Sequence, residues 1–369
     1  MKEFYIGLMS GTSVDSIDSV LVNLSKNSCE IINKASTPIN QKLKKRVFEA
    51  VNRKDLIQSE IHELDLQMGE LFGQSVLSLL RKVSIKTNKV KAIGSHGQTI
   101  KHLPYGNDRY SLQIGSPKII TDLTKIKTVA DFRKSDIEAG GQGAPLSPLF
   151  HEYLFKINKV SKGVIINIGG ISNLTRLDLS EKRISAYDSG PGNCLLDSWC
   201  RKHKKKDFDF EGSWAASGKV NPDLLKKMME DYFFTKNPPK STGPDYFNPR
   251  WIKNHIKNFK DLSPEDIQAT LNELTVKTIF SELKKTKSLK EKIYICGGGI
   301  HNTFLINRLE EMIGNKTLST TDLGINPDYL EACCFAWLAK ERLKEKKFNL
   351  SSITGSSKPI LLGEIWEPF

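Results

Sequence analysis

Residues 163–177 read GVIINIGGISNLTRL, and this stretch decides the fold class. Its predominantly apolar start predicts a buried strand, the paired glycines predict a turn, and the residues after them predict a second strand. The same order of elements opens the chain, with FYIGLM at 4–9, SGTS at 10–13 and SVLVNL at 19–24. Because the two modules lie about 160 residues apart, the sequence indicates an internal duplication.

Predicted helices and strands alternate through the rest of the chain. Apolar residues recur every three or four positions over 56–83, which predicts a long helix with one apolar face. Two further helices are expected to start at Ser263 and at Asn326, each followed by proline and acidic residues, and the second should run to about Lys344. Short apolar runs predict strands at 29–32, 91–94, 127–130, 184–187 and 292–296. The expected class is therefore α/β, with two similar lobes and a cleft between them.

A glycine-rich stretch marks the expected boundary between the lobes. Residues 139–145 read AGGQGAP and interrupt the alternation of elements. We expect an N-terminal lobe over 1–139 and a C-terminal lobe over 140–369, with the C-terminal segment joining the N-terminal lobe.

Composition excludes several classes of protein. With 369 residues and 38% hydrophobic residues, the chain is neither disordered nor short of a core. No apolar run reaches the ~18–20 residues of a membrane span, and the N-terminus does not follow a signal-peptide pattern. Six cysteines without metal-binding spacing favour a reduced, cytoplasmic setting. The net charge of +13 comes from dispersed lysines, with only 11 arginines, so we expect neither a nucleic-acid nor a membrane partner.

Three small-residue turns each follow an apolar strand, at 10–13, 169–173 and 297–302. Turns without bulky side chains let backbone N–H groups converge on an anion, so they suit phosphates. None is a P-loop or a dinucleotide fingerprint, and each alone fits an ordinary turn better than a ligand site. Together, in a duplicated frame, they predict two hairpins that clamp a triphosphate and a third loop that borders the nucleoside.

Two acidic residues accompany these turns. Asp15 follows the first turn, where its carboxylate is able to hold Mg²⁺ directly or through water. Asp188 is expected at the end of a strand, before a helix. It is consistent both with a turn or N-cap residue and with a general base at the floor of the cleft.

At these residues the chain resembles the anhydro-N-acetylmuramic acid kinases, a branch of the sugar kinase, Hsp70 and actin superfamily. The resemblance covers nearly the whole chain. The matching motifs, in order, are GLMSGTSVDSID at 7–18, SHGQT at 95–99, DFR at 131–133, GGQGAPL at 140–146, NIGGISNL at 167–174, DSGPGN at 188–193, KSTG at 240–243, CGGG at 296–299 and EA at 331–332. The family usually has glycine where Ser16 stands. If that position requires a positive φ, Ser16 is strained and ATP affinity is affected.

The resemblance implies the fold, the ligands and the reaction. The fold would be the two-lobed, duplicated actin-like or hexokinase-like ATPase fold. ATP, Mg²⁺ and water would convert 1,6-anhydro-N-acetylmuramic acid to N-acetylmuramic acid 6-phosphate, a step in peptidoglycan recycling. Asp188 would be the one carboxylate base, because the departing O6 is captured by the γ-phosphoryl group rather than by a proton. The implied nucleotide-binding residues are Gly11, Thr12, Ser13, Val14, Asp15, Ser16, Ile17, Asp18, Gly169, Gly170, Asn173, Gly298, Gly299 and Asn302, with Asp15 also at the metal.

The implied substrate-binding residues are His96, Gln98, Asp131, Arg133 and Glu331. Arg133 is the candidate partner of the lactyl carboxylate, whereas in isolation it would be read as a surface ion pair. His96 and Gln98 are candidates for sugar hydroxyls, and the alternative for His96 is a satisfied loop histidine. Glu331 is expected one turn into its helix, facing the cleft or simply complementing the helix dipole.

Two other functions fit parts of this pattern. One is a sugar kinase of the same fold acting on a free hydroxyl, and the other is a non-catalytic, nucleotide-dependent conformational protein. The second predicts slow ATP turnover that no sugar affects. Related proteins suggest a homodimer.

Overall fold

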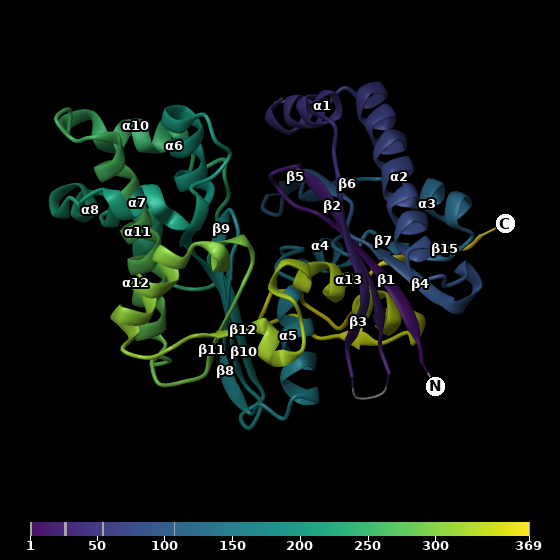
Figure 1. Ribbon diagram of the computed structural model, residues 1–369. Helices are drawn as coiled ribbons and strands as arrows, with labels where there is room; N and C mark the ends of the chain where they lie inside the picture. The colour runs from purple at the N-terminus through teal and green to yellow at the C-terminus, as the bar shows by residue number, and fades with distance from the viewer. Residues whose placement is uncertain (1, 26–27, 54, 107, 369) are drawn as a thin grey trace. The chain divides into compact units, whose positions relative to one another are not determined.

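The computed structural model describes residues 2–25, 28–53, 55–106 and 108–368, which form two compact units (Figure 1). Unit 1 comprises Met1–Ile157 and Tyr329–Phe369, and unit 2 comprises Asn158–Asp328. The division therefore falls after Ile157, whereas the glycine-rich stretch placed it at 139. The reason is packing: the ring of Tyr153 stacks on Trp337 in the C-terminal stretch of unit 1, with centroids 5.4 Å apart.

Unit 1 is built around a mixed sheet with the strand order β15-β7-β4-β1-β2-β3. The strands of unit 1 are β1 (Phe4–Ser10), β2 (Ser16–Asn23), β3 (Glu30–Pro38), β4 (Val90–Ser95), β5 (Gln98–Leu103), β6 (Tyr110–Ile114), β7 (Thr128–Ala130), β13 (Lys347–Phe348), β14 (Ile360–Leu361) and β15 (Glu364–Trp366). β5 pairs with β6 and β13 with β14 in two separate two-stranded sheets. Its α-helices are α1 (Gln41–Asn52), α2 (Gln58–Arg81), α3 (Pro117–Thr124), α4 (Lys134–Glu138), α5 (Ser147–Ile157) and α13 (Leu330–Leu343).

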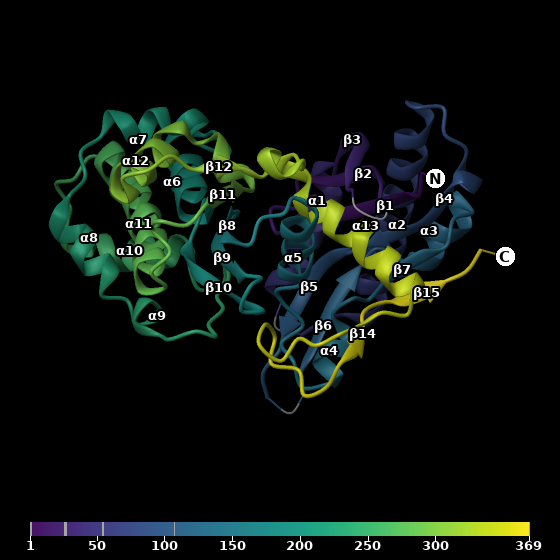
Figure 2. The ribbon, with the colours of Figure 1, turned by 90° about the horizontal axis from the view of Figure 1, so that it is seen from below.

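Unit 2 has a sheet with the strand order β10-β9-β8-β11-β12. Its strands are β8 (Lys162–Ile168), β9 (Ile171–Asp178), β10 (Arg183–Pro191), β11 (Ile293–Cys296) and β12 (Leu318–Ser319). Its α-helices are α6 (Cys194–Lys204), α7 (Ser213–Ser217), α8 (Pro222–Met229), α9 (Tyr232–Thr235), α10 (Pro249–His255), α11 (Pro264–Lys285) and α12 (Thr303–Ile313). These helices gather to one side of the strands, around the long α11 (Figure 2).

The two sheets share one topology. In unit 1 the first three strands form an antiparallel meander, and β4 then pairs parallel to β1 and β7 parallel to β4. In unit 2 β8, β9 and β10 form the meander, and β11 pairs parallel to β8 and β12 parallel to β11. The α/β class and the duplication predicted from the repeated strand–turn–strand modules are therefore confirmed.

Side-chain alternation along β1 explains how its sheet is covered on both faces. Ile6 and Leu8 are fully buried in the core that includes the apolar face of α2. The Cβ position of Gly7 faces the opposite side of the sheet, because successive residues of a strand face opposite sides. A Cβ at Gly7 would lie 1.7 Å from the carbonyl oxygen of Ala332, so the helix α13 crosses the sheet in direct contact with its backbone.

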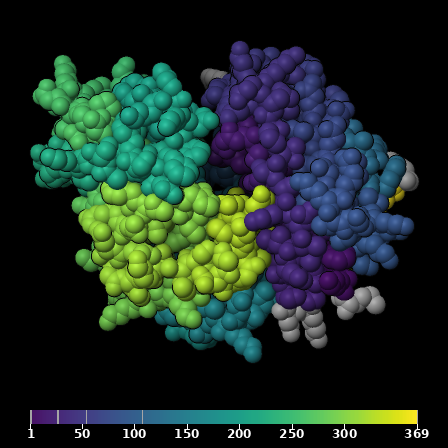
Figure 3. Space-filling model, in the orientation of Figure 1, coloured from purple at the N-terminus to yellow at the C-terminus, as the bar shows by residue number. Residues whose placement is uncertain are grey.

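Gly94 extends this contact to the neighbouring strand. It is the register partner of Gly7 in β4, and a Cβ there would lie 2.0 Å from the carbonyl oxygen of Phe335. The paired glycines form a flat strip on which α13 lies. The same C-terminal stretch lies beside the N-terminal strands, where the Lys34 ammonium is 4.9 Å from the centroid of the Tyr329 ring (Figure 3).

Two predicted helix starts have different outcomes. Ser263 is the N-cap of α11 and accepts a hydrogen bond from the Asp266 N–H, as predicted. The helix expected from Asn326 begins at Leu330 instead, after a short 3₁₀ turn over Pro327–Tyr329. Asn326 caps that short turn through its own side chain, which accepts from the Asp328 N–H. Glu331 consequently lies in the first turn of α13 rather than one turn further in.

None of the helices in the described ranges combines the length and the apolarity that crossing a bilayer requires.

Candidate active site

The first small-residue turn joins β1 to β2 in unit 1. Val14 adopts a left-handed φ of 51°, and its N–H donates to the Gly11 carbonyl at 3.1 Å. Ser16 lies in the extended backbone of β2, so the strain considered for Ser16 does not arise; the unusual φ belongs to Val14. A Cβ at Gly11 would meet nothing within 4 Å, which leaves this side of the turn open to a ligand.

The residues predicted to bind nucleotide around this turn differ in exposure. Val14 and Ile17 are buried in the core of unit 1, and Thr12, Ser13 and Asp15 are exposed. The remaining three, Gly11, Ser16 and Asp18, are half-buried. The Asp15 carboxylate forms an ion pair with Lys44 of α1. Mg²⁺ bound with a nucleotide usually takes one or two protein carboxylates and completes its shell with phosphate oxygens and water. An exposed carboxylate beside an open turn fits that requirement.

The two predicted turns of unit 2 lie next to each other, because β8 and β11 are parallel neighbours that both end there. A Cβ at Gly297 would lie 2.2 Å from the Asn167 side-chain oxygen, and one at Gly299 would lie 2.3 Å from Ile168. Gly298 is open by comparison, with its first neighbour at 4.0 Å. Asn302 uses its side chain to cap α12, accepting from the Leu305 N–H at 3.0 Å.

The second turn also holds the segment that follows β10. The carbonyls of Gly169 and Gly170 accept hydrogen bonds from the N–H groups of Gly192, Asn193 and Cys194. These contacts fix the start of α6 against the turn between β8 and β9. Asn173, a predicted nucleotide-binding residue, lies in β9 as the register partner of Asp188.

Asp188 lies within β10 rather than at its end, at a point where the pairing with β9 changes register. A register irregularity re-aims a side chain out of the regular pleat, which is why such features recur at functional sites. The Thr242 N–H donates to the Asp188 carboxylate at 2.8 Å. Burial raises the pKa of Asp188 to about 7, against the Thr242 hydrogen bond and the charge of Lys240, which both lower it.

The half-buried Arg133 and the buried His96 form a pair in unit 1. The Arg133 guanidinium donates to His96 Nε2 at 2.8 Å, and His96 Nδ1 lies 2.9 Å from the Gly97 carbonyl oxygen. A guanidinium only donates and a carbonyl only accepts, so His96 carries its proton on Nδ1. Burial and the Arg133 charge lower the pKa of His96 to about 3, which keeps the ring neutral. Both ring nitrogens of His96 thus have protein partners.

Arg133 remains charged despite its surroundings. Burial lowers its pKa to about 10, and the Glu331 carboxylate opposes this shift. The guanidinium also donates to the Gly143 carbonyl at 3.3 Å. These contacts hold the cation in one place and bring together three residues that the sequence analysis grouped only by resemblance: His96, Arg133 and Glu331.

The other two predicted substrate residues, Gln98 and Asp131, lie in different parts of unit 1. Gln98 is buried and accepts from the Ser10 hydroxyl at 2.7 Å, which ties β5 to the first turn. Asp131 follows β7 in a left-handed conformation with φ 55°, which aspartate tolerates better than most residues.

Two residues that shape these sites, Asp136 and Lys240, carry no role that the sequence predicts. Asp136 is fully buried and accepts from the Gly143 N–H at 2.6 Å and the Thr354 hydroxyl at 2.7 Å, so it fixes the glycine-rich loop that Arg133 contacts. Lys240 belongs to the motif KSTG at 240–243, but its carbonyl accepts from the Asp188 N–H across more than fifty positions of sequence. No local pattern predicts such a contact.

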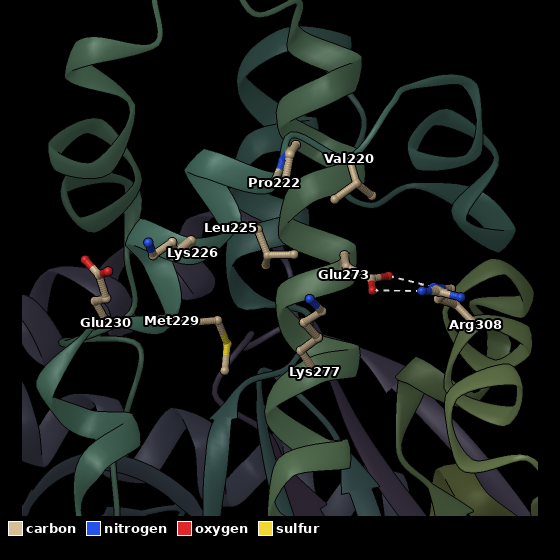
Figure 4. Close-up of a pocket in the computed structure, with 9 residues that line it drawn as sticks. All are labelled: Val220, Pro222, Leu225, Lys226, Met229, Glu230, Glu273, Lys277 and Arg308. Carbon is tan, nitrogen blue, oxygen red and sulfur yellow. Dashed lines mark hydrogen bonds and ion pairs between the residues drawn. The ribbon is translucent and has the colours of Figure 1, made fainter.

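A pocket of about 720 Å³ lies elsewhere in unit 2, between α8, α11 and α12 (Figure 4). Its apolar floor includes Leu225 and Met229, and Glu273 and Arg308 form a two-bonded ion pair at its edge. None of the predicted site residues lines it. In the described part of the chain, no three His, Cys, Asp or Glu side chains gather closely enough to hold a metal ion.

Two α/β units of one topology, with small-residue turns at equivalent strand ends, define a duplicated α/β protein whose turns suit phosphate groups. A family model described as "Anhydro-N-acetylmuramic acid kinase" matches residues 3–368. The chain belongs to the anhydro-N-acetylmuramic acid kinase family.

Two anhydro-N-acetylmuramic acid kinases agree with this assignment. The chain is 45% identical to an anhydro-N-acetylmuramic acid kinase from Coxiella burnetii, over 99% of this chain and 98% of the relative. It is 42% identical to one from Pseudomonas syringae, over 99% of this chain and 100% of the relative. Among solved structures, an activator of the 2-hydroxyisocaproyl-CoA dehydratase from Clostridium difficile has a TM-score of 0.45 at 13% identity, covering 94% of this chain and 99% of that one.

Proposed function

We propose that this protein is an ATP-dependent kinase that opens 1,6-anhydro-N-acetylmuramic acid and phosphorylates its O6, in the recycling of peptidoglycan. Family membership over residues 3–368 supports the reaction class. The single structural observation that supports the chemistry is Asp188, a carboxylate whose pKa burial raises to about 7. A general base works best when its pKa lies near the working pH, because a large fraction of it is then ionised and the ionised form still binds a proton strongly.

The proposed reaction balances with one base. Water attacks C1 of the sugar and gives its proton to Asp188, while the C1–O6 bond breaks. The electron pair released on O6 attacks the γ-phosphorus of ATP, so ADP leaves and O6 carries the phosphoryl group. No acid has to protonate O6, which is why a second carboxylate is not needed.

The turns would hold the nucleotide. Backbone N–H groups around Gly11 and around Gly169 are our candidates for the phosphates, and the turn at Gly298 is our candidate for the nucleoside. Asp15 is our candidate for Mg²⁺, after release from Lys44. Bound there, Mg²⁺ would offset charge on the phosphates. The free thiols of all six cysteines support a reducing compartment, and we place the reaction in the cytoplasm.

One assay tests the function as a whole. We expect ADP formation to depend on 1,6-anhydro-N-acetylmuramic acid, with a product heavier by one water and one phosphoryl group. In ¹⁸O-water, one ¹⁸O atom should enter the product at C1. ATP turnover that ignores the sugar would instead indicate a nucleotide-dependent conformational protein. Phosphorylation of a sugar hydroxyl without uptake of ¹⁸O would indicate an ordinary sugar kinase.

Arg133 is our candidate partner of the lactyl carboxylate. Its guanidinium is charged and fixed by His96 and Gly143, which lowers the entropy lost when it binds an anion. Replacing Arg133 by methionine should raise the KM for the anhydro sugar about ten- to hundredfold, the value of a charge-assisted hydrogen bond. Steady-state kinetics at saturating ATP measure this.

The matched control is Lys134→Met, which removes the next cation along the chain, an exposed residue paired with Glu364. Its KM should stay at the wild-type value. A substrate analogue with a neutral lactyl amide should bind the wild type more weakly than the natural acid does. The Arg133→Met variant should bind the amide and the acid with equal affinity. If the Arg133 variant still preferred the acid, another cation would be the partner.

A further inference from the structure

The segment around Lys240 lies along the free edge of β10, beside Asp188. β10 is the outermost strand of its sheet, so its outer edge has no strand partner among the strands of unit 2. There the Asp188 N–H donates to the Lys240 carbonyl at 3.0 Å, and the Thr242 N–H donates back to the Asp188 carboxylate at 2.8 Å. The segment therefore forms hydrogen bonds with both the backbone and the side chain of Asp188.

The Lys240 side chain turns inward and is fixed there. Its ammonium is 3.0 Å from Glu282 of α11, and the two side chains are 1% and 4% exposed. It also lies 4.9 Å from the centroid of the Phe233 ring. A buried ion pair with this geometry costs desolvation free energy, and an apolar pair of similar size would often serve stability equally well. The buried charge therefore calls for an explanation other than stability.

The charges around Asp188 in unit 2 come from three elements. β10 carries Asp188 and Tyr187, α11 carries Glu282 and Lys285, and the edge segment carries Lys240. Lys285 is half exposed and also contacts Glu282, at 2.9 Å. Burial of Tyr187 raises its pKa, with the nearby Glu282 carboxylate adding to the shift, so Tyr187 stays neutral.

Two opposing effects act on the Asp188 carboxylate. Burial raises its pKa and the Thr242 N–H and the Lys240 charge lower it, with a net value of about 7. Without the cation, the balance moves further toward the protonated acid, which is unable to accept a proton from water.

We propose that Lys240, held by Glu282, is a positioning residue for the reaction: it fixes the Thr242 amide against Asp188 and keeps that carboxylate ionised for its role as base. The inference rests on the proposed function of Asp188. Lys240 acts through Asp188 and contacts neither substrate nor nucleotide in this scheme.

The test is the pH profile of kcat/KM for 1,6-anhydro-N-acetylmuramic acid with saturating Mg-ATP, measured on the full chain. Activity that requires ionised Asp188 rises with pH through the pKa of the free enzyme's base. Removing a nearby cation disfavours the carboxylate, so in Lys240→Met this ascending limb should move to higher pH, by about half to one unit. At pH 7, where the wild-type base is about half ionised, kcat/KM should fall about two- to sixfold, while the plateau at high pH and the KM stay close to wild type.

The double variant Lys240→Met/Glu282→Leu separates charge from folding, because it removes the cation without leaving a buried carboxylate behind. It should show the same upward shift. The control Lys284→Met removes an exposed lysine of the same helix and should leave the limb in place. An unmoved limb in both Lys240 variants would overturn the inference, and so would an equal loss of rate at every pH.

The outcome also distinguishes this inference from the proposed function. If Asp188→Asn is inactive while the Lys240 variants keep the wild-type profile, only the role of Lys240 fails. If Asp188→Asn keeps both its rate and its ascending limb, the base is another group and the proposed function of Asp188 fails first.

Discussion

Asp188→Asn should lose both ring opening and phosphoryl transfer, by a factor of about 10³ or more in kcat, which is within the range for removal of a general base. The two activities fall together because O6 becomes a nucleophile only when water has attacked C1. Asparagine keeps the size of the side chain and an oxygen that accepts from the Thr242 N–H, so the fold is retained. ADP release and product mass, followed in the same reaction, measure the two steps.

Asp223→Asn is the matched control, since Asp223 is an exposed carboxylate in the first turn of α8. It should leave both activities at the wild-type level. Near-wild-type phosphorylation of the anhydro sugar by Asp188→Asn would show that a different residue activates the water.

Gly7→Ala should lower the free energy of unfolding by about 3 kcal/mol, at the upper end of what overpacking costs. The added methyl would lie 1.7 Å from the Ala332 carbonyl oxygen, which belongs to the backbone of α13. A backbone atom is unable to rotate away as a side chain would, so the whole helix has to shift from the sheet. Urea unfolding, followed by tryptophan fluorescence, measures the change.

Gly11→Ala provides the comparison for stability. Gly11 follows the same strand, has no positive φ, and a Cβ there would meet nothing within 4 Å. Its unfolding free energy should stay within about 0.5 kcal/mol of the wild type. Equal stability of Gly7→Ala and Gly11→Ala would mean that α13 does not pack on the strand as closely as described.

The parts of the fold that follow from local pattern were predictable. The repeated strand–turn–strand modules identified both meanders, and the spacing of apolar residues identified α2. The Ser263-Pro264 start identified α11. What failed depends on contacts between distant segments. β5 begins at Gln98, within the motif SHGQT, where no strand was predicted; its pairing with β6 stabilises it. β15 is a three-residue strand that exists through its pairing with β7.

The candidate site divides in the same way. Motifs pointed to Asp188 and Arg133, but the sequence placed Asp188 at a strand end and assigned any unusual backbone to Ser16. The register change in β10 and the left-handed Val14 are properties of paired strands and of one particular turn, which residue types alone do not specify. The pairing of Arg133 with His96 and of Lys240 with Glu282 joins residues about forty positions apart, so only the folded chain reveals it.

Unit 1 is assembled from both ends of the chain, since β15 completes its sheet beside β7 and α13 covers the strip at Gly7 and Gly94 (Figure 1). A ribosome therefore delivers every residue of unit 2 before it delivers the helix that closes unit 1. Until then, the sheet face that α13 covers stays exposed on nascent unit 1, and transiently exposed apolar surface of this kind is prone to aggregation.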